Sequence, residues 1–87
     1  MRRYRCWHDV IESLLKALLT GEKRITELCL HANIPVDRGR RLIEYLIRCG
    51  LIFKYEKDGR IYYRITEKGY EWLGIYRKLK EILHLSL

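Results

Sequence analysis

Apolar residues recur every three or four positions over several stretches of the chain. In the first stretch, residues 7–20, the recurring side chains are Trp7, Val10, Ile11, Leu14, Leu15, Leu18 and Leu19. This spacing predicts an amphipathic helix whose apolar stripe belongs to the core, and Gly21 is its stop signal. The stripe implies packing and no chemistry.

Two further helices are predicted to follow around a tight turn. A short helix over residues 27–32 begins after Thr26, whose hydroxyl is a suitable N-cap. Asn33 tolerates the left-handed backbone that a turn needs, and Pro35 favours the start of the next helix. Helix, tight turn and helix is the geometry that lets the second of two helices project from a domain.

This projecting helix, residues 36–49, has two unlike faces. One stripe is apolar or small and needs a core: Gly39, Leu42, Ile43 and Leu46. The opposite side is basic with one aromatic ring: Arg38, Arg41, Tyr45 and Arg48, with Arg40 on a flank. Such a helix suits a polyanion, and our hypothesis is DNA, with residues 38–45 facing the major groove. Glycine inside a helix costs roughly 1 kcal/mol relative to alanine, and close approach by another helix or by backbone would explain Gly39.

Residues 51–66 predict a β-hairpin. Two runs rich in β-branched and aromatic residues flank Asp58-Gly59, the strongest short hairpin signal. A two-residue turn pairs position 57 with 60, 55 with 62, 53 with 64, 52 with 65, 54 with 63 and 56 with 61. Residues 52, 63 and 65 then face the core. The tip carries Lys57 and Arg60, which are either solvated, as at most hairpin tips, or placed to contact phosphate.

Residues 67–85 predict a long last helix with Thr66 as its N-cap. Its apolar residues form two rows, Trp72, Ile75, Leu79 and Ile82 in one and Leu73, Tyr76 and Leu83 in the other, which Lys80 interrupts. The spacing alternates three and four, as in a coiled-coil seam. A domain of this size cannot cover both rows, so we expect one row to pack on the domain and the other on a second copy. The predicted dimer contacts are Trp72, Ile75, Tyr76, Leu79, Ile82 and Leu83. The alternative is that the last turns fray and only the first half packs.

Composition narrows the class of protein. The chain has 87 residues, 48% of them hydrophobic, which predicts one small domain and excludes a disordered chain. No apolar run approaches the roughly 20 residues of a membrane span. The net charge of +7, concentrated before Thr66, is typical of a nucleic-acid binder. The absence of glutamine beside abundant charged and aliphatic residues fits a thermophilic source, and the lack of an apolar signal core predicts a cytoplasmic protein.

The roles of the N-terminal arm and of the three cysteines stay open. The basic arm MRRYR, residues 1–5, is either a frayed terminus or a segment that follows a phosphate backbone or enters a minor groove. The three cysteines, Cys6, Cys29 and Cys49, are interpreted as buried free thiols, although an intracellular disulfide or a pair across a dimer is an alternative.

Catalytic and metal chemistry is not expected. The pairs Cys6/His8 and Cys29/His31 suggest zinc, but helical residues two apart point about 200° from each other and cannot hold one ion. We expect Cys29 inward and His31 outward, and we predict no metal, no cofactor and no small-molecule ligand. The chain has no glycine-rich phosphate loop and no recognisable nucleophile–base pair, so an enzyme is not predicted.

The order of these elements resembles a winged helix-turn-helix. The resemblance is carried by Ile25-Thr26, residues 32–34 and 42–46, the Gly50-Leu51-Ile52 junction, and residues 63–69. More narrowly, the chain resembles small archaeal winged-helix DNA-binding proteins that dimerise through a C-terminal helix, including examples from viruses of thermophilic archaea. The resemblance implies an α+β fold with three helices, a two-stranded wing and a long C-terminal helix. Residues 1–66 would form the DNA-binding domain, and residues 67–87 a dimerisation helix packed on the same domain and paired antiparallel with its copy.

The function that the resemblance implies is double-stranded DNA binding by a homodimer, as a transcriptional regulator acting in the cytoplasm, or in the host cytoplasm if viral. Helix 36–49 would enter the major groove and the wing tip, residues 57–60, would contact the backbone. The predicted DNA-binding residues are Thr26, Arg38, Arg40, Arg41, Tyr45, Arg48, Lys57 and Arg60. Two alternatives stay open: sequence-tolerant architectural DNA binding, and a protein-interaction module that uses the outward aromatics Phe53, Tyr55 and Tyr62.

Overall fold

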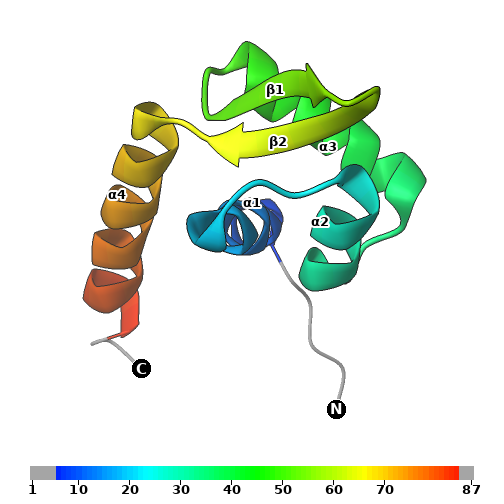
Figure 1. The fold of residues 1–87 in the computed structure, drawn as a ribbon. Coiled ribbons are helices and arrows are strands. Elements are labelled where there is room, and N and C mark those ends of the chain that lie inside the picture. The colour runs from blue at the N-terminus through cyan, green and yellow to red at the C-terminus, as the bar shows by residue number, and fades with distance from the viewer. Residues whose placement is uncertain (1–5, 85–87) are drawn as a thin grey trace.

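The computed structural model describes residues 6–84, so the predicted arm of residues 1–5 and the end of the last helix lie outside the described residues. In chain order the elements are α1 (Trp7–Ala17), the 3₁₀ turn η1 (Leu18–Thr20), α2 (Ile25–Ala32), α3 (Val36–Arg48), β1 (Ile52–Lys57), β2 (Arg60–Ile65) and α4 (Glu67–His84). The α1 helix lies beneath the hairpin, with α2 on one side of it and α4 on the other, and α3 runs behind the two strands in this view (Figure 1). The predicted α+β fold is confirmed.

The core lies where α1, α2, α3 and the inner face of the hairpin meet. Its most deeply buried side chains are Leu14, Leu15, Leu28, Ile43 and Leu46. The predicted stripe of the first helix was wrong at both ends, because Trp7 is 57% exposed and Leu19 is 45% exposed. Trp7 occupies the first position of α1, and Leu19 lies in η1, where the tighter 3₁₀ period rotates it away from the α-helical stripe.

The turn between α2 and α3 has the predicted geometry but a different cap. The N-cap prediction for Thr26 was wrong, because α2 begins at Ile25 and Arg24 is its N-cap. The backbone N–H of Arg24 donates to Oε1 of Glu27 at 3.1 Å, so a carboxylate one turn into the helix secures this end. Asn33 ends α2 in the left-handed conformation, with φ 58° and ψ 49°, as the sequence predicted.

Gly39 marks the close approach of two helices. A Cβ atom at this position in α3 would overlap Sγ of Cys29 on α2 and would lie 3.2 Å from Cδ1 of Ile34. Any larger residue would therefore push α3 away from α2. The missing side chain fixes how closely α3 docks on the domain.

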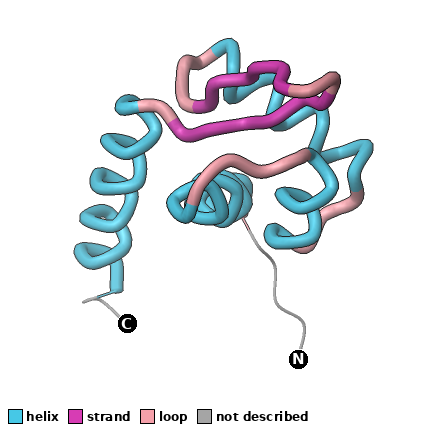
Figure 2. Tube along the Cα trace, in the orientation of Figure 1, coloured by secondary structure: helices cyan, strands magenta, loops and turns pink. Residues whose placement is uncertain are grey.

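The two strands form a hairpin (Figure 2). Its register is the predicted one, with Ile52 opposite Ile65 and Lys57 opposite Arg60. Asp58 and Gly59 both have positive φ, 54° and 74°, which is the backbone of a type I′ turn. A single residue of the η1–α2 connection extends the sheet. The N–H of Lys23 donates to the carbonyl of Tyr63 at 3.1 Å, and the carbonyl of Lys23 accepts a hydrogen bond from the N–H of Tyr63 at 2.9 Å.

Thr66 caps α4 as the sequence predicted. Its Oγ1 accepts a hydrogen bond from the N–H of Gly69 at 3.0 Å and donates one to the carbonyl of Gly50 at 2.6 Å. A Cβ on Gly69 would lie 2.6 Å from the carbonyl oxygen of Leu51, so only glycine lets α4 start this close to the α3–β1 junction. The cap thereby ties the last helix to the end of α3.

One face of α4 packs on α1. The hydroxyl of Tyr76 donates to Oδ1 of Asp9 at 2.7 Å, and Nζ of Lys80 lies 2.7 Å from Oε2 of Glu12. The indole of Trp72 stacks on the Tyr76 ring at 4.9 Å.

None of the helices within residues 6–84 is both long and apolar enough to cross a membrane.

The other face of α4 is not covered by any other part of residues 6–84. Ile75 is 55% exposed, Leu79 50% and Ile82 66%. These residues are spaced four and three apart, so they form one continuous strip along the helix. Of the predicted dimer contacts, Trp72 and Tyr76 are engaged with the chain's own α1 side, whereas this strip faces solvent.

Candidate nucleic-acid interface

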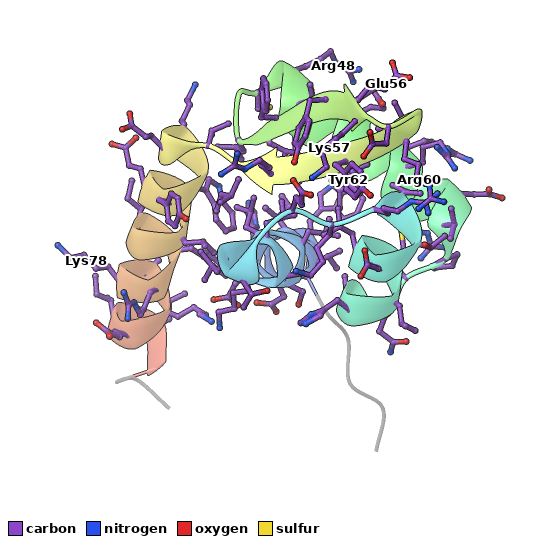
Figure 3. The ribbon with its side chains drawn as sticks, in the orientation of Figure 1. Arg48, Glu56, Lys57, Arg60, Tyr62 and Lys78 are labelled. Atoms are coloured by element: carbon purple, nitrogen blue, oxygen red, sulfur yellow. The ribbon has the colours of Figure 1, made fainter. Side chains whose placement is uncertain are left out.

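The exposed side of α3 carries the predicted cations. Its buried stripe, Gly39, Leu42, Ile43 and Leu46, holds the helix from behind. The opposite side is exposed at every position predicted to meet DNA on this helix: Arg38, Arg40, Arg41, Tyr45 and Arg48. Within residues 6–84, none of these guanidiniums forms an ion pair or a hydrogen bond with another residue. Figure 3 shows Arg48 extending away from the ribbon. These cations are therefore available to an outside anion.

Acidic residues do little to cancel this charge. Glu44, on the same helix, forms an ion pair with Lys54 on β1, with 3.4 Å between Oε2 of Glu44 and Nζ of Lys54. Asp37 lies in the first turn of α3, where its carboxylate is favoured by the positive end of the helix dipole. The four arginines of α3 consequently leave the exposed surface positive.

Tyr45 is an exposed aromatic among these arginines. Hydrogen bonding to the thiol of Cys49 raises the pKa of the Tyr45 hydroxyl above its ordinary value of 10.0. The hydroxyl therefore stays protonated at neutral pH and can donate a hydrogen bond to a phosphate oxygen or a base edge.

The two cations of the wing tip differ in their surroundings. Nζ of Lys57 lies 2.8 Å from Oε2 of Glu22, in the connection before α2, and 5.2 Å from the centre of the Tyr62 ring (Figure 3). The hydrogen bond to Glu22 raises the pKa of Lys57, so this cation is held by the protein itself. Arg60 is exposed and forms no ion pair with another described residue. This difference between Lys57 and Arg60 could not be predicted from the sequence, because Glu22 lies 35 residues away from Lys57 and no local pattern indicates that the two side chains meet.

The outward aromatic residues of the wing stack on one another. Phe53 stacks on Tyr55 at 5.8 Å between ring centres, and Tyr55 stacks on Tyr62 at 6.0 Å. Tyr55 and Tyr62 are half-buried, and Lys57 covers the end of the row. Tyr55 and Tyr62 are a cross-strand aromatic pair, which stabilises a hairpin, whereas Phe53 lies on the same strand as Tyr55 and is 55% exposed.

Thr26 occupies the second position of α2 and is exposed. The first amides of a helix have no intrahelical acceptor and favour anions. Although Thr26 is not the N-cap, it lies in the first turn of α2, at the N-terminal end of the helix, where a phosphate would be favoured.

One residue of this surface was missed by the sequence analysis. Trp7, expected in the core, lines a shallow hollow of about 280 Å³ together with Arg38, Arg41, Leu42 and Tyr45 of α3. Periodicity placed Trp7 on the apolar stripe of α1, and only its position at the helix start, directly after a basic arm, could have indicated otherwise.

The cysteines are free and have three different environments. Cys29 is buried, Cys49 is half-buried and Cys6 is exposed, so the expectation of buried thiols was wrong for Cys6. Burial raises the pKa of the Cys29 thiol, which keeps it protonated. His31 is exposed while Cys29 points inward, as predicted. No group of three His, Cys, Asp or Glu side chains suited to a metal occurs among residues 6–84.

Comparison with known proteins establishes the class. A sequence model of the winged helix-turn-helix family matches residues 2–84, so the chain belongs to this family. The solved structure of Sso10a-2, a DNA-binding protein from Sulfolobus solfataricus, superposes with a TM-score of 0.78 at 21% identity, over 94% of this chain and 88% of that one. No curated protein sequence matches the chain.

Two further structures share the fold. The homodimeric winged helix-turn-helix DNA-binding domain Mb0332 from Mycobacterium bovis, a possible ArsR-family transcriptional regulator, has a TM-score of 0.72 at 17% identity, over 90% of this chain and 75% of that one. The transcriptional regulator BldR from Sulfolobus solfataricus has a TM-score of 0.70 at 18% identity, over 86% of this chain and 60% of that one. At such identities the likeness supports the fold alone.

Proposed function

We propose that this protein binds double-stranded DNA as a homodimer and acts as a transcriptional regulator. The observation that carries the proposal is the pairing of a fully buried stripe on α3 with an exposed side whose arginines have no acceptor within the described chain. A rigidly supported helix with free cations suits the major groove, which is wide enough to admit a helix.

Each side chain then has a distinct role. Arg38 and Arg41, one turn apart on α3, would contact base edges or phosphates, and a bidentate arginine–guanine pair gives roughly 1–3 kcal/mol of discrimination. Arg40 and Arg48 would hold phosphates on the flanks, and Tyr45 would donate its hydroxyl. Thr26 at the start of α2 and Arg60 at the wing tip would position the domain on the backbone. Lys57 would contribute less, because Glu22 competes for it.

The homodimer is proposed from the uncovered strip of α4, Ile75, Leu79 and Ile82. An antiparallel pair of these helices would bury both strips and set two α3 helices at a fixed separation. Half-sites would then lie about one helical turn of DNA apart, roughly 34 Å, or a multiple of that distance if the helix pair acts as a spacer. The homodimeric state of Mb0332 supports a dimer of this fold, whichever helices form its interface.

Source and location are also proposals. Two of the similar structures come from Sulfolobus solfataricus, and the composition favours a thermophile, so we propose an archaeal origin and a cytoplasmic location. A viral origin stays an expectation of the sequence resemblance.

Sequence-tolerant, architectural DNA binding is the second candidate, because free arginines neutralise phosphates whatever the bases. Selection of bound sites from a random duplex pool, at stated salt, separates the two functions. A regulator enriches one motif and stays on it when random duplex competes, whereas an architectural protein enriches none and is displaced by random duplex as readily as by any other sequence.

Duplex binding itself is tested by measuring affinity at a series of salt concentrations. A DNA binder loses affinity with a log–log slope near −0.9 for each phosphate that it neutralises. We expect a slope of several units. A slope near zero, or no binding to duplex, would contradict DNA binding and would favour the alternative that the protein is a protein-interaction module.

A further inference from the structure

Trp7 is a large apolar side chain that the core does not bury. It begins α1 and exposes 57% of its surface, although it is one of the two largest apolar side chains of the molecule. A single exposed apolar residue is common on proteins and needs no explanation. What distinguishes Trp7 is its place, because it borders the exposed side of α3 and not a neutral part of the surface.

The hollow beside Trp7 has a mixed chemistry. Its floor includes the buried Leu42, and its aromatic walls are Trp7 and Tyr45. Its cations are Arg38 and Arg41, neither of which is paired with another described residue. An occupant of this hollow needs an apolar part that covers the rings and an anionic part within reach of the guanidiniums.

A sugar–phosphate unit has this combination. The C–H faces of deoxyribose are apolar, and the adjoining phosphate is an anion that arginine binds bidentately. The hollow is continuous with the α3 surface proposed to enter the major groove, and the backbone borders that groove on both sides. A protein partner would have to bring its own carboxylate to these arginines, whereas the DNA backbone supplies an anion at every nucleotide.

We propose that Trp7 is a DNA-contacting residue, which packs against a deoxyribose–phosphate unit of the backbone flanking the major groove while Arg38 and Arg41 bind its phosphate or the adjacent base. The inference rests on the proposed duplex binding and adds α1 to the interface. Because sugar is the same at every base pair, the contact strengthens binding without selecting sequence.

The test compares the full chain with Trp7→Ala, Trp7→Phe and Leu19→Ala on a labelled duplex of random sequence, at several salt concentrations. Leu19 is the matched control, because it is also an exposed apolar residue but lies in η1 beyond the other end of α1. We expect Trp7→Ala to weaken binding roughly fivefold or more at every salt concentration, the scale of removing one partly buried aromatic ring. Its salt slope stays that of the wild type, because the substitution changes no charge. Trp7→Phe recovers part of the affinity, and Leu19→Ala binds as the wild type does.

A second readout reports contact directly. We expect duplex to change the tryptophan emission of the wild type, and the change to disappear in Trp7→Phe, which retains only Trp72 beside α1. Circular dichroism checks that each variant keeps its fold.

The outcomes separate this inference from the proposed function. If the wild type shows salt-dependent duplex binding but Trp7→Ala binds equally well, Trp7 is outside the interface and the function stands. A loss of affinity that comes with a changed salt slope or a lost fold also overturns the inference, as does an emission change that persists in Trp7→Phe. If the wild type does not bind duplex, the proposed function itself has failed.

Discussion

Whether a cation can serve an outside anion depends on the carboxylates that the fold brings to it. Lys57 and Arg60 are cross-strand neighbours at one wing tip, yet Glu22 binds Lys57 and leaves Arg60 exposed. The partner comes from a distant part of the chain, so no local pattern predicts it. The exposure of the α3 arginines could be predicted, because helical spacing alone places them on the side opposite the buried stripe.

Removing the Glu22 carboxylate should release Lys57 for DNA. We expect Glu22→Gln to raise duplex affinity at low salt by roughly two- to fivefold, the scale of one exposed ion pair, and to steepen the salt slope. Glu71→Gln on the exposed side of α4 makes the same change of net charge far from the wing and serves as the control. Equal effects of the two variants would show that Lys57 does not reach the DNA.

A second residue-scale feature joins α1 to α4. The hydrogen bond from Tyr76 lowers the pKa of Asp9 below its ordinary value of 3.8, and the same bond raises the pKa of Tyr76. A carboxyl group with a lowered pKa in the folded protein stabilises the fold above its unfolded-state pKa, and this contribution is lost as pH falls through the folded-state value.

We therefore expect Tyr76→Phe to lower the free energy of unfolding by roughly 0.5–1 kcal/mol at pH 7, in the lower part of the range for one hydrogen bond because the pair is partly exposed. The difference from the wild type should shrink as pH falls below about 4, where Asp9 is protonated in the unfolded chain. Denaturant unfolding at pH 7 and pH 3 measures both values. A difference that does not depend on pH would exclude the charged hydrogen bond as its cause.

Among the elements, those set by local signals could be predicted from the sequence. The hairpin register follows from Asp58-Gly59 and the alternation around it, and the start of α4 follows from Thr66. The errors occur at element ends. Trp7 and Leu19 are apolar in the expected phase, but Trp7 lies at the helix start and Leu19 in a 3₁₀ turn, and periodicity contains no information about where a helix leaves the core.

Glycines in α3 and α4 differ in what surrounds them. A Cβ on Gly39 would overlap Cys29, whereas one on Gly74 would meet nothing within 4 Å. We expect Gly39→Ala to destabilise the protein by roughly 1–3 kcal/mol, the usual range for overpacking. Gly74→Ala, the matched control, should stabilise it by about 0.5–1 kcal/mol through helix propensity.

Thermal unfolding of the two variants measures these changes. The double variant Cys29→Ala/Gly39→Ala should recover part of the loss, because the sulfur that a Cβ would meet is gone. Equal stability of Gly39→Ala and Gly74→Ala would contradict the close docking of α3 on α2.

At the scale of the whole molecule, the sequence predicts one part that binds DNA and another that forms a dimer. Tyr76 and Lys80 of α4 contact α1, whereas Ile75, Leu79 and Ile82 are exposed. Leu83, another predicted dimer contact, is 65% exposed as well. Which row would face inward could not be predicted, because the choice depends on where Asp9 and Glu12 of α1 lie in space.

The uncovered row predicts a dimer that polar substitutions should dissociate. We expect Leu79→Gln/Ile82→Gln to be monomeric and folded, and to bind a two-half-site duplex more weakly than the wild type, because the two α3 helices are no longer linked. Leu30→Gln on α2, a still more exposed apolar position, should stay dimeric. Multi-angle light scattering and circular dichroism measure both properties, and a variant that remains a dimer would place the interface elsewhere.

The free arginines of α3 are tested most directly by the salt dependence of duplex binding for the wild type, Arg38→Ala/Arg41→Ala and Arg77→Ala. Arg77 is an exposed arginine of α4, and Arg77→Ala is the control for losing a positive charge elsewhere on the surface, one charge against the two lost from α3. The α3 variant should bind much more weakly, with a salt slope shallower by about one unit for each phosphate that it no longer neutralises, while Arg77→Ala stays close to the wild type. Wild-type affinity and slope in the α3 variant, or an equally weakened Arg77→Ala, would contradict the proposal that this face of α3 binds DNA.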